Sequence, residues 1–310
     1  MSGVPRASGL PDYGPAGTVN FNPELYSGKL VEKFYKTTVF GEIASTDYEG
    51  EIAGYGAQVK IRTIPDITVS DYVVGAGLSA QYPTNNSVTL TIDQAKSFAV
   101  ALSTVDSRQS DMDLADVFAN DGSIQLRIAA DADMLETIPA QVSADNAGRF
   151  AGADSSSIDL GDSTTPFSLT KTNIVDFIVD AGTVLDEQNV SDEGRWFVLP
   201  PWAVALIKKS DLRIASLAGD GVSILRNGKV GEIDRFTIFQ SRNLLAQTTP
   251  GLANYAMFGH SAGLTFAAQI LEAQMIDNPN DFGYIIRGLM VFGYEVIEPK
   301  YVGTAVIKRG

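Results

Sequence analysis

The longest helical pattern of hydrophobic positions runs over residues 109–142. Apolar residues recur three and four positions apart, at Leu114, Val117, Ile124, Ile128, Leu135 and Ile138. This spacing places them on one side of a helix that would be roughly 40 Å long. Because Asp121 and Asp131 interrupt the stripe and Gly122 weakens its middle, the pattern favours an extended helix that supports a sheet and neighbouring molecules. An ordinary amphipathic helix inside a compact protein is the alternative.

Between Ala57 and Asp106 the hydrophobic period changes to two, which is typical of half-buried strands. The alternating apolar residues are Val59, Ile61, Val88, Leu90, Ile92, Phe98, Val100 and Leu102. The piece between the two groups contains Pro65, Pro83 and two glycines, which a central strand tolerates poorly. Residues 57–107 are therefore predicted to form a long two-stranded projection with an irregular tip. An isolated ribbon of two strands is only marginally stable in water, so its exposed edges require a partner.

Beyond the long helix, the pattern predicts an α+β second lobe. Residues 147–167 are rich in Gly, Ser and Asp, and we interpret them as a linker at the lobe boundary. The elements predicted after the linker are a helix over 169–187, a buried strand over 195–199, a helix that begins at Pro200-Pro201, a tight turn at Asn227-Gly228 and a strand over 235–240. From residue 255 onward the pattern is one of short strands, so the chain is predicted to return to the sheet beside the long helix.

The N-terminal segment has a different composition from the rest of the chain. Residues 1–22 are rich in Gly, Pro and Ser and are predicted to be an extended arm that gains order by contact with another surface. In the next segment, residues 23–40, apolar residues fall on one side of a short predicted helix. This helix packs either on its own domain or on a neighbouring molecule, and the sequence leaves both options open.

Composition and charge limit the function classes. The 310 residues are 45% hydrophobic and 19% charged, as in a folded soluble protein that divides into two unequal lobes. The net charge of −14 opposes binding along a nucleic-acid backbone, although it does not oppose a position close to nucleic acid. The absence of cysteine excludes disulfides and thiolate metal sites. No apolar run of about twenty residues and no secretory leader is present, so we expect neither a membrane partner nor secretion.

One stretch imitates a catalytic motif. Gly259-His260-Ser261-Ala262-Gly263 matches the G-x-S-x-G nucleophile elbow of serine hydrolases. That chemistry needs a histidine downstream of the serine, and His260 is the only histidine in the chain. The residues that follow are typical of a strand rather than of the required helix. The motif is therefore predicted to be a tight turn between two strands.

The other candidate sites are equally weak. Gly75-Ala76-Gly77 and Gly219-Asp220-Gly221 are parts of a dinucleotide fingerprint, but neither opens a helix after a strand. The aspartates that could suggest a cation site are Asp111, Asp113, Asp116, Asp131, Asp133 and the pair Asp277 and Asp281. Those on the helix are expected mostly on its solvated face, and the last pair fails the calcium-loop pattern. Adventitious binding of calcium or magnesium at one of these sites is an alternative. We expect no catalytic residue, no cofactor and no functional metal site.

Several short motifs in combination resemble a known family. They are residues 193–201 (EGRWFVLPP), 227–233 (NGKVGEI), Phe236, Ser241-Arg242-Asn243, Phe282, Arg287-Gly288, Val291, Gly293 and residues 295–299. Together they resemble the central and C-terminal parts of tailed-bacteriophage major capsid proteins. The resemblance covers the chain from about Leu30 to Ile307, and each motif alone is weak.

The resemblance implies an α+β fold of the Hong Kong ninety-seven capsid type. In that arrangement residues 1–56 would be the N-terminal arm and first helix, and 57–107 the extended loop. Residues 108–168 would be the spine helix and peripheral domain, and 169–265 the axial domain. Residues 266–310 would return to the peripheral and axial sheets.

The resemblance also implies a structural function. The chain would be a major capsid protein that assembles with copies of itself into pentamers and hexamers, forming an icosahedral head around double-stranded DNA. Scaffolding, portal and decoration proteins would be further partners, and DNA would lie nearby without sequence recognition. The protein would occupy the virion, and the host cytoplasm during assembly. The alternatives are an encapsulin-like compartment shell and a soluble α+β hydrolase.

Overall fold

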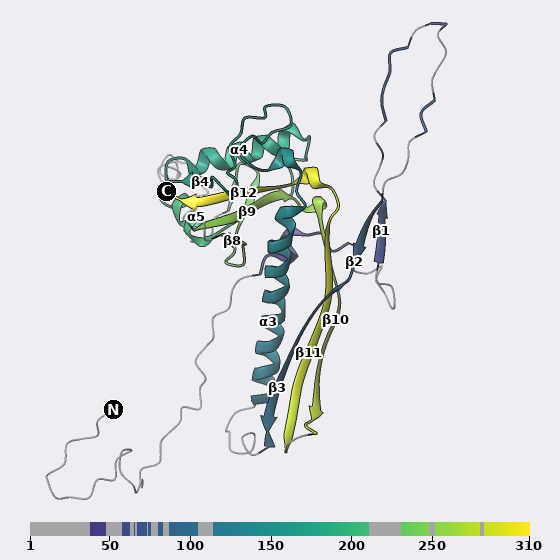
Figure 1. Cartoon of the computed structure of the whole chain (residues 1–310), viewed down its shortest axis with the longest axis vertical. Coiled ribbons are helices and arrows are strands. Elements are labelled where there is room, and N and C mark those ends of the chain that lie inside the picture. The colour runs from purple at the N-terminus through teal and green to yellow at the C-terminus, as the bar shows by residue number, and fades with distance from the viewer. Residues whose placement is uncertain are drawn as a thin grey trace, which may run out of the picture.

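The structure, a computed structural model of the whole chain, describes residues 38–47, 58–62, 65, 67–72, 74–75, 80–82, 87–104, 114–210, 231–247, 252–279 and 282–310, without the side chains of 269–273. Three predicted features lie outside these residues: the arm and most of its following helix, the start of the long helix, and the Asn227-Gly228 turn. The described part consists of a long helix beside a narrow sheet, a second lobe at one end of them, and a ribbon that leaves near the junction (Figure 1).

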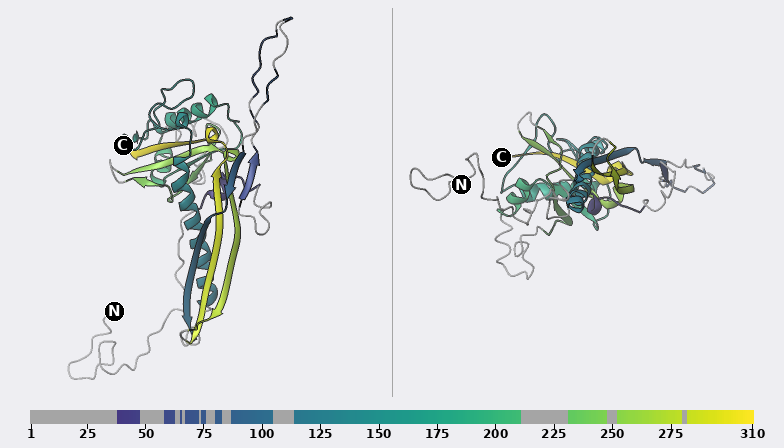
Figure 2. Two further views of the ribbon diagram at one scale, coloured as in Figure 1. Left: turned by 45° about the vertical axis from the view of Figure 1, so that its right-hand side comes forward. Right: turned by 90° about the horizontal axis from the view of Figure 1, so that it is seen from below.

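The long helix is confirmed as a single element. Helix α3 spans Leu114–Thr137, and a 3-10 turn, Ile138–Ala140, ends it at Pro139. It lies along a three-stranded antiparallel sheet with the order β10-β11-β3 (Figure 2). The strands of this sheet are β3 (Gln94–Ser103), β10 (Leu264–Asp277) and β11 (Gly283–Val296). The helix therefore covers one face of the sheet instead of lying inside a compact core.

Strand β3 corrects the predicted extent of the projection. We assigned all of residues 57–107 to one two-stranded ribbon, but β3 pairs with β11 along its whole length, with Phe98 opposite Gly288. The chain leaves the ribbon at Ile92-Asp93 and enters the sheet beside α3. An alternating pattern identifies a strand but not its partner, because the strand that pairs with β3 lies about 190 residues later in the chain.

The ribbon itself is confirmed over a shorter range. Strands β1 (Gln58–Arg62) and β2 (Ser87–Thr91) pair in an antiparallel two-stranded sheet of their own. A small apolar cluster at its base, built from Ile61, Leu90, Ile92 and Ala267, fixes the ribbon to strand β10. This cluster anchors one end of the ribbon, and none of the described loop residues between the two strands belongs to it.

The second lobe contains a mixed seven-stranded sheet. Its order is β4-β12-β9-β5-β7-β6, with β8 paired to β9. The strands are β4 (Phe167–Leu169), β5 (Arg195–Leu199), β6 (Glu232–Ile233), β7 (Phe236–Gln240), β8 (Ala246–Gln247), β9 (Ala253–His260) and β12 (Val302–Arg309). Helices α4 (Ile174–Glu187) and α5 (Pro201–Ile207) pack on it, with proline in the first turn of α5 as predicted.

All five residues of strand β5 are buried, because side chains on both of its faces are covered. Phe197 and Leu199 belong to the core shared with α4 and α5. Trp196 and Val198 point to the other face and join a second core formed with the C-terminal half of α3. Since both faces of the sheet are covered, the strand has no solvated side and its sequence does not alternate.

Two short 3-10 turns carry the chain between the two sheets. Ser261–Gly263 joins β9 to β10, and Pro299–Tyr301 joins β11 to β12. The turns pack closely, since a Cβ on Gly263 would come within 2.7 Å of the Tyr301 Cβ. The strands predicted from residue 255 onward are therefore divided between the sheets, and only β10 and β11 flank the long helix. None of the described helices is long and apolar enough to cross a membrane.

Candidate interaction site

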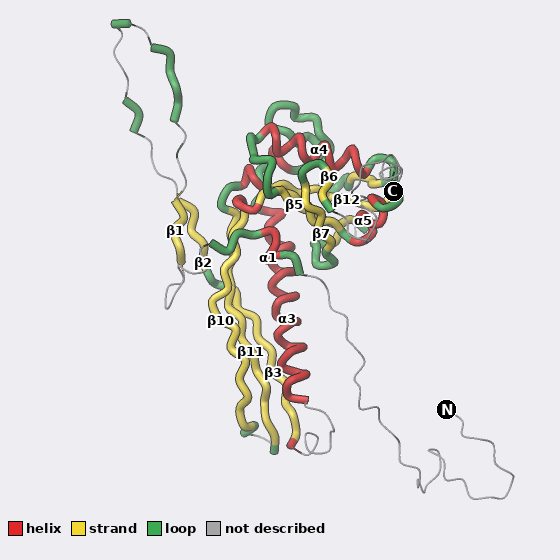
Figure 3. Tube along the Cα trace, turned by 180° about the vertical axis from the view of Figure 1, so that it is seen from behind, coloured by secondary structure: helices red, strands yellow, loops and turns green. Residues whose placement is uncertain are grey.

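The loop of the ribbon carries apolar side chains that its own chain does not cover. Its described residues run beyond the ends of β1 and β2, away from both sheets (Figure 3). Five of the loop side chains are between 68% and 92% exposed, namely Ile67, Val69, Tyr72, Val74 and Tyr82. Exposed apolar side chains gathered in one segment are typical of an interaction surface. The sequence predicted the projection, but it did not show that these particular side chains remain uncovered.

A glutamine side chain ties the two sides of this loop together. The Thr68 N–H donates to Gln81 Oε1 at 3.1 Å, and Gln81 Nε2 donates to the Thr68 carbonyl at 2.7 Å. The amide group therefore replaces a pair of backbone ladder bonds between the two sides. A loop whose sides are already connected loses less conformational freedom when it binds. No pattern in the sequence indicated this pairing, because neither residue type is specific for it.

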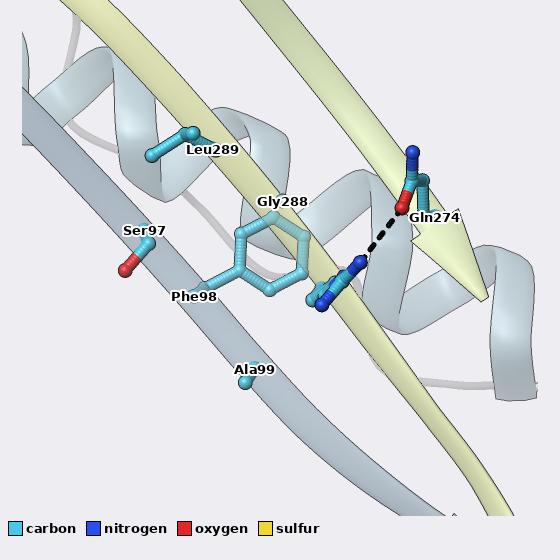
Figure 4. Close-up of a pocket in the computed structure, with 7 residues that line it drawn as sticks. Ser97, Phe98, Ala99, Gln274, Gly288 and Leu289 are labelled. Carbon is cyan, nitrogen blue, oxygen red and sulfur yellow. Dashed lines mark hydrogen bonds between the residues drawn. The ribbon is translucent and has the colours of Figure 1, made fainter. Parts of the chain in front are cut away.

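The face of the three-stranded sheet that points away from α3 forms a shallow groove. Figure 4 shows it with the helix behind the strands. It has a volume of about 420 Å³ and is lined by Ser97, Phe98, Ala99, Gln274, Arg287, Gly288 and Leu289. Arg287 Nη2 donates to Gln274 Oε1 at 2.9 Å across the groove. The groove thus combines exposed apolar surface, including Leu289 at 40% exposure, with one fixed cation.

The predicted position of Asp131 on the solvated face of the helix is wrong. We expected it mostly on the solvated face of the helix, but it is fully buried. Its Oδ1 accepts from the backbone N–H groups of Val39 at 2.8 Å and Phe40 at 3.0 Å, and its Oδ2 accepts from Asn243 Nδ2 at 2.6 Å. Burial raises the pKa of Asp131, and the hydrogen bonds from Asn243, Val39 and Phe40 offset that rise only in part. The signal in the sequence was the aspartate within an apolar stripe.

The segment that Asp131 holds is also tied to strand β10. It contains a single helical turn, α1 (Phe40–Ile43), followed by Ser45. The Ser45 N–H donates to the Leu264 carbonyl at 2.8 Å, and the Phe266 N–H donates to the Ser45 carbonyl at 3.0 Å. The N-terminal part of the described chain is therefore fixed where α3 and the two sheets meet.

A second charged group stabilises the other lobe. Arg195 is buried, and its Nη2 donates to Asp186 Oδ1 at 2.7 Å and Asp192 Oδ1 at 3.2 Å. Arg235, at the surface, donates to the same two carboxylates at 2.9 Å and 2.6 Å. Burial alone would raise the pKa of Asp186, but the hydrogen bonds from Arg235 and Arg195 outweigh it and lower that pKa. Because both carboxylates are already paired with arginines, this group is structural.

The imitation of a nucleophile elbow is a turn, as predicted. Ser261 opens the 3-10 turn between β9 and β10, and β10 follows it directly instead of a helix. His260 Nδ1 accepts from the Ala262 N–H at 3.0 Å, so the imidazole caps this turn. The roles of His260 and Ser261 in forming this turn account for both residues without a catalytic role.

The remaining candidates do not come together into a site. Asp133 pairs with Lys96 at 3.2 Å, and Gly75 sits in the ribbon loop with a φ of +89°. Asp111, Asp113, Gly77, Asp281 and residues 219–221 lie outside the described residues. Within the described part of the chain, no three acidic or histidine side chains gather where they could hold a metal ion.

The overall fold of the chain is similar to that of several solved structures. One from Mycobacterium phage Che8 is 26% identical and has a TM-score of 0.74, covering 92% of this chain and 97% of that one. The capsid structure of the Cyanophage P-SCSP1u is 15% identical with a TM-score of 0.70, over 100% of both chains. The mature capsid of bacteriophage PhiM1 is 17% identical with a TM-score of 0.66, over 99% of both chains.

Comparison of the sequence with family models and with curated proteins found no match. The likeness to phage capsid structures nevertheless extends over almost the whole chain. The chain therefore has an α+β fold of the phage capsid type, and the resemblance to tailed-phage major capsid proteins is confirmed at the level of the fold.

Proposed function

We propose that this chain is a major capsid protein that assembles with copies of itself, through rings of five and six subunits, into a closed head around double-stranded DNA. The observation that carries the proposal is the ribbon loop. In a chain with the fold of phage capsid proteins, this loop exposes its apolar side chains away from its own body and holds its two sides together through Gln81 and Thr68.

The energetics favour many contacts over one. Full burial of an exposed Val or Ile side chain contributes about 1.5–3 kcal/mol, so five side chains of this kind contribute on the order of 10 kcal/mol. Association costs about 4–15 kcal/mol in lost freedom of movement. A single loop contact is thus close to balance, and a ring or shell in which every copy gives and receives a loop is stable through repetition.

The groove on the three-stranded sheet is our candidate receptor for the loop of another copy. Asp71 lies between the exposed Val69 and Tyr72 in the loop, and Arg287 is the cation in the groove. A loop of one copy in the groove of the next joins two different patches, so the contact is head to tail. Such contacts close into rings when the rotation between copies permits it.

The finer assignments that accompany this function are proposals of the same kind. Helix α3 would act as the spine of a peripheral domain, and the seven-stranded lobe would be the axial domain at the centre of each ring. The net charge of −14 is suited to a shell that confines DNA without adhering to it. Scaffolding, portal and decoration proteins remain predicted partners, and the virion remains the predicted location.

The experiment compares two loop variants in self-association. Val69→Asp places a charge where an apolar side chain is expected to be covered by another copy, whereas Ser70→Asp adds the same charge at a neighbouring exposed position. We expect wild type and Ser70→Asp to sediment as large particles and Val69→Asp to sediment as single chains with unchanged secondary structure. Particles formed equally well by all three proteins would refute a role for the loop in assembly.

A charge exchange tests the proposed receptor. Asp71→Arg and Arg287→Asp should each weaken assembly, because each places like charges on the loop and the groove. The double variant should assemble better than either single one, since it restores opposite charges. If the double variant is as weak as the two single effects combined, the loop binds elsewhere.

A further inference from the structure

Asp131 places a titratable carboxyl group inside an apolar core. It is fully buried among side chains such as Val39, Met134 and Leu244. Its hydrogen-bond partners are two backbone N–H groups and one side-chain amide, none of which carries a charge. Such a group is stable as an anion only to the extent that these donors replace water.

Asp131 connects three parts of the chain that are far apart in sequence. It projects from α3, it holds the segment Val39–Ser45, and it meets Asn243 in the connection after β7. Among the described residues, the other backbone ties of that segment to the body are those of Ser45 with β10. The state of this one carboxyl group therefore affects how the N-terminal segment is fixed to both lobes.

Among the described residues, no neighbouring charge shifts the pKa of Asp131. The ionisable residues on the segment 38–47, α3, β3, β11 and the connection after β7 are Glu42, Asp47, Lys96, Asp116, Asp121, Arg127, Asp133, Glu136, Arg242, Tyr284, Arg287, Tyr294 and Glu295. None of them hydrogen-bonds to Asp131, and its pKa is set by burial and by its three hydrogen bonds. Asp133, two residues along the helix, is itself paired with Lys96. Titration of Asp131 is therefore determined by its own burial and hydrogen bonds.

An unpaired oxygen beside Asp131 can accept a hydrogen bond from its protonated carboxyl group. Asn243 Oδ1 is buried and has no hydrogen-bond partner. If Asp131 gains a proton on Oδ2, a half-turn of the Asn243 amide brings Oδ1 to accept it. Asp131 Oδ1 continues to accept from Val39 and Phe40. The protonated form thus keeps the contacts with the segment and leaves no buried charge, while Asn243 Nδ2 takes the place of Oδ1 as the unpaired atom of the amide.

We infer that Asp131 is a proton-sensitive latch that holds the segment Val39–Ser45 most tightly when it is protonated and releases it progressively as the pH rises. The latch acts within one chain, so it goes beyond the proposed role in assembly. In the released state the carboxyl group reaches water, where its pKa returns to about 3.9. Because burial raises that pKa in the closed state, the released fraction increases up to about tenfold per pH unit between the two values.

Amide hydrogen exchange measures this latch directly. Exchange of the Val39 and Phe40 amides is followed in the full-length protein from about pH 4 to about pH 8 and corrected for the intrinsic rate. We expect their protection to fall with rising pH and then to level. Asp131→Asn, which mimics the protonated form, should keep the protection and lose the pH dependence. Asp133→Asn should leave the pH dependence of wild type.

Two results would overturn the inference. One is protection of Val39 and Phe40 that does not change with pH in wild type, and the other is an unchanged pH dependence in Asp131→Asn. Asp131→Leu should expose both amides at every pH, since it removes the acceptor. If Asp131→Leu does not fold, the comparison of wild type with Asp131→Asn still decides. The readout concerns amides inside one chain, so a failure here does not contradict the proposed assembly.

Discussion

Gly122 on α3 lies directly against the ring of Phe98 on β3, in the space that a Cβ on the helix would occupy. The other side of the same ring fills the space above Gly288 on β11. The ring is therefore enclosed between two glycines, one on the helix and one on the paired strand. A glycine that weakens the helix locally thus allows the helix to approach the sheet closely.

Gly122→Ala should destabilise the protein although alanine is the better helix former. Alanine gains about 1 kcal/mol in helix propensity, but overpacking a close contact costs about 1–3 kcal/mol, and Gly288 prevents the ring from moving away. We expect a net loss of up to about 2 kcal/mol in the free energy of unfolding, measured by urea denaturation.

Gly41→Ala is the matched control, because a Cβ at Gly41 in α1 meets nothing within 4 Å. It should be neutral or slightly stabilising. Combining Gly122→Ala with Phe98→Leu should cost less than the sum of the two single changes, since the smaller side chain removes the clash. A stabilised Gly122→Ala protein would show that the ring does not restrict the helix.

Arg195 and Arg235 bind the same two carboxylates but differ in burial. Replacing buried Arg195 with Met leaves the Val190 and Gly182 carbonyls without their donor, whereas Asp186 keeps its bond to Arg235, so we expect a loss of about 1–3 kcal/mol. Replacing exposed Arg235 with Gln should cost less than about 1 kcal/mol. Urea denaturation of the two variants measures both, and equal losses would contradict the argument from burial.

Asp186 should contribute to stability at neutral pH and lose that contribution in acid. Its pKa in the folded protein is lowered by the two arginines despite its partial burial. A lowered pKa means that the unfolded chain binds the proton more readily, so stability falls as the pH drops through the folded value. Asp186→Asn should be less stable than wild type at pH 7, and the difference should shrink below about pH 4. A difference that is constant with pH would contradict this assignment.

Gln81→Ala should affect assembly without affecting folding. The residue lies in an exposed loop, so unfolding should change by no more than about 0.5 kcal/mol. The loop would then be less ordered before binding, and association should weaken several-fold, as measured by sedimentation. Ala80→Ser, at the adjacent exposed position, should leave both quantities unchanged. Equal assembly of the two variants would mean that the link to Thr68 does not prepare the loop.

Local pattern predicted the parts of the fold that rest on local physics. The three- and four-residue spacing predicted α3, and the alternation around Val59 and Val88 predicted the ribbon. The run of buried residues over 195–199 correctly indicated a strand covered on both faces. These features depend on periodicity and on turn residues close in sequence.

Features that depend on residues far away in the chain could not be predicted from local sequence patterns. The alternation of β3 was recognised, but its pairing with β11 was not, because the register is decided by tertiary packing. Asp131 is buried because Val39, Phe40 and Asn243 supply donors from elsewhere in the chain. The turn between β6 and β7 uses Asp234 and Arg235 with positive φ angles instead of the more usual Asn-Gly pair.

Electron microscopy of the purified chain can show whether it assembles with copies of itself. We expect closed particles of uniform diameter, built from rings of five and six copies in which the loop containing Val69 and Tyr82 is covered by a neighbouring copy. A protein that stays monomeric at high concentration, with those side chains still exposed to solvent, would contradict the proposed assembly.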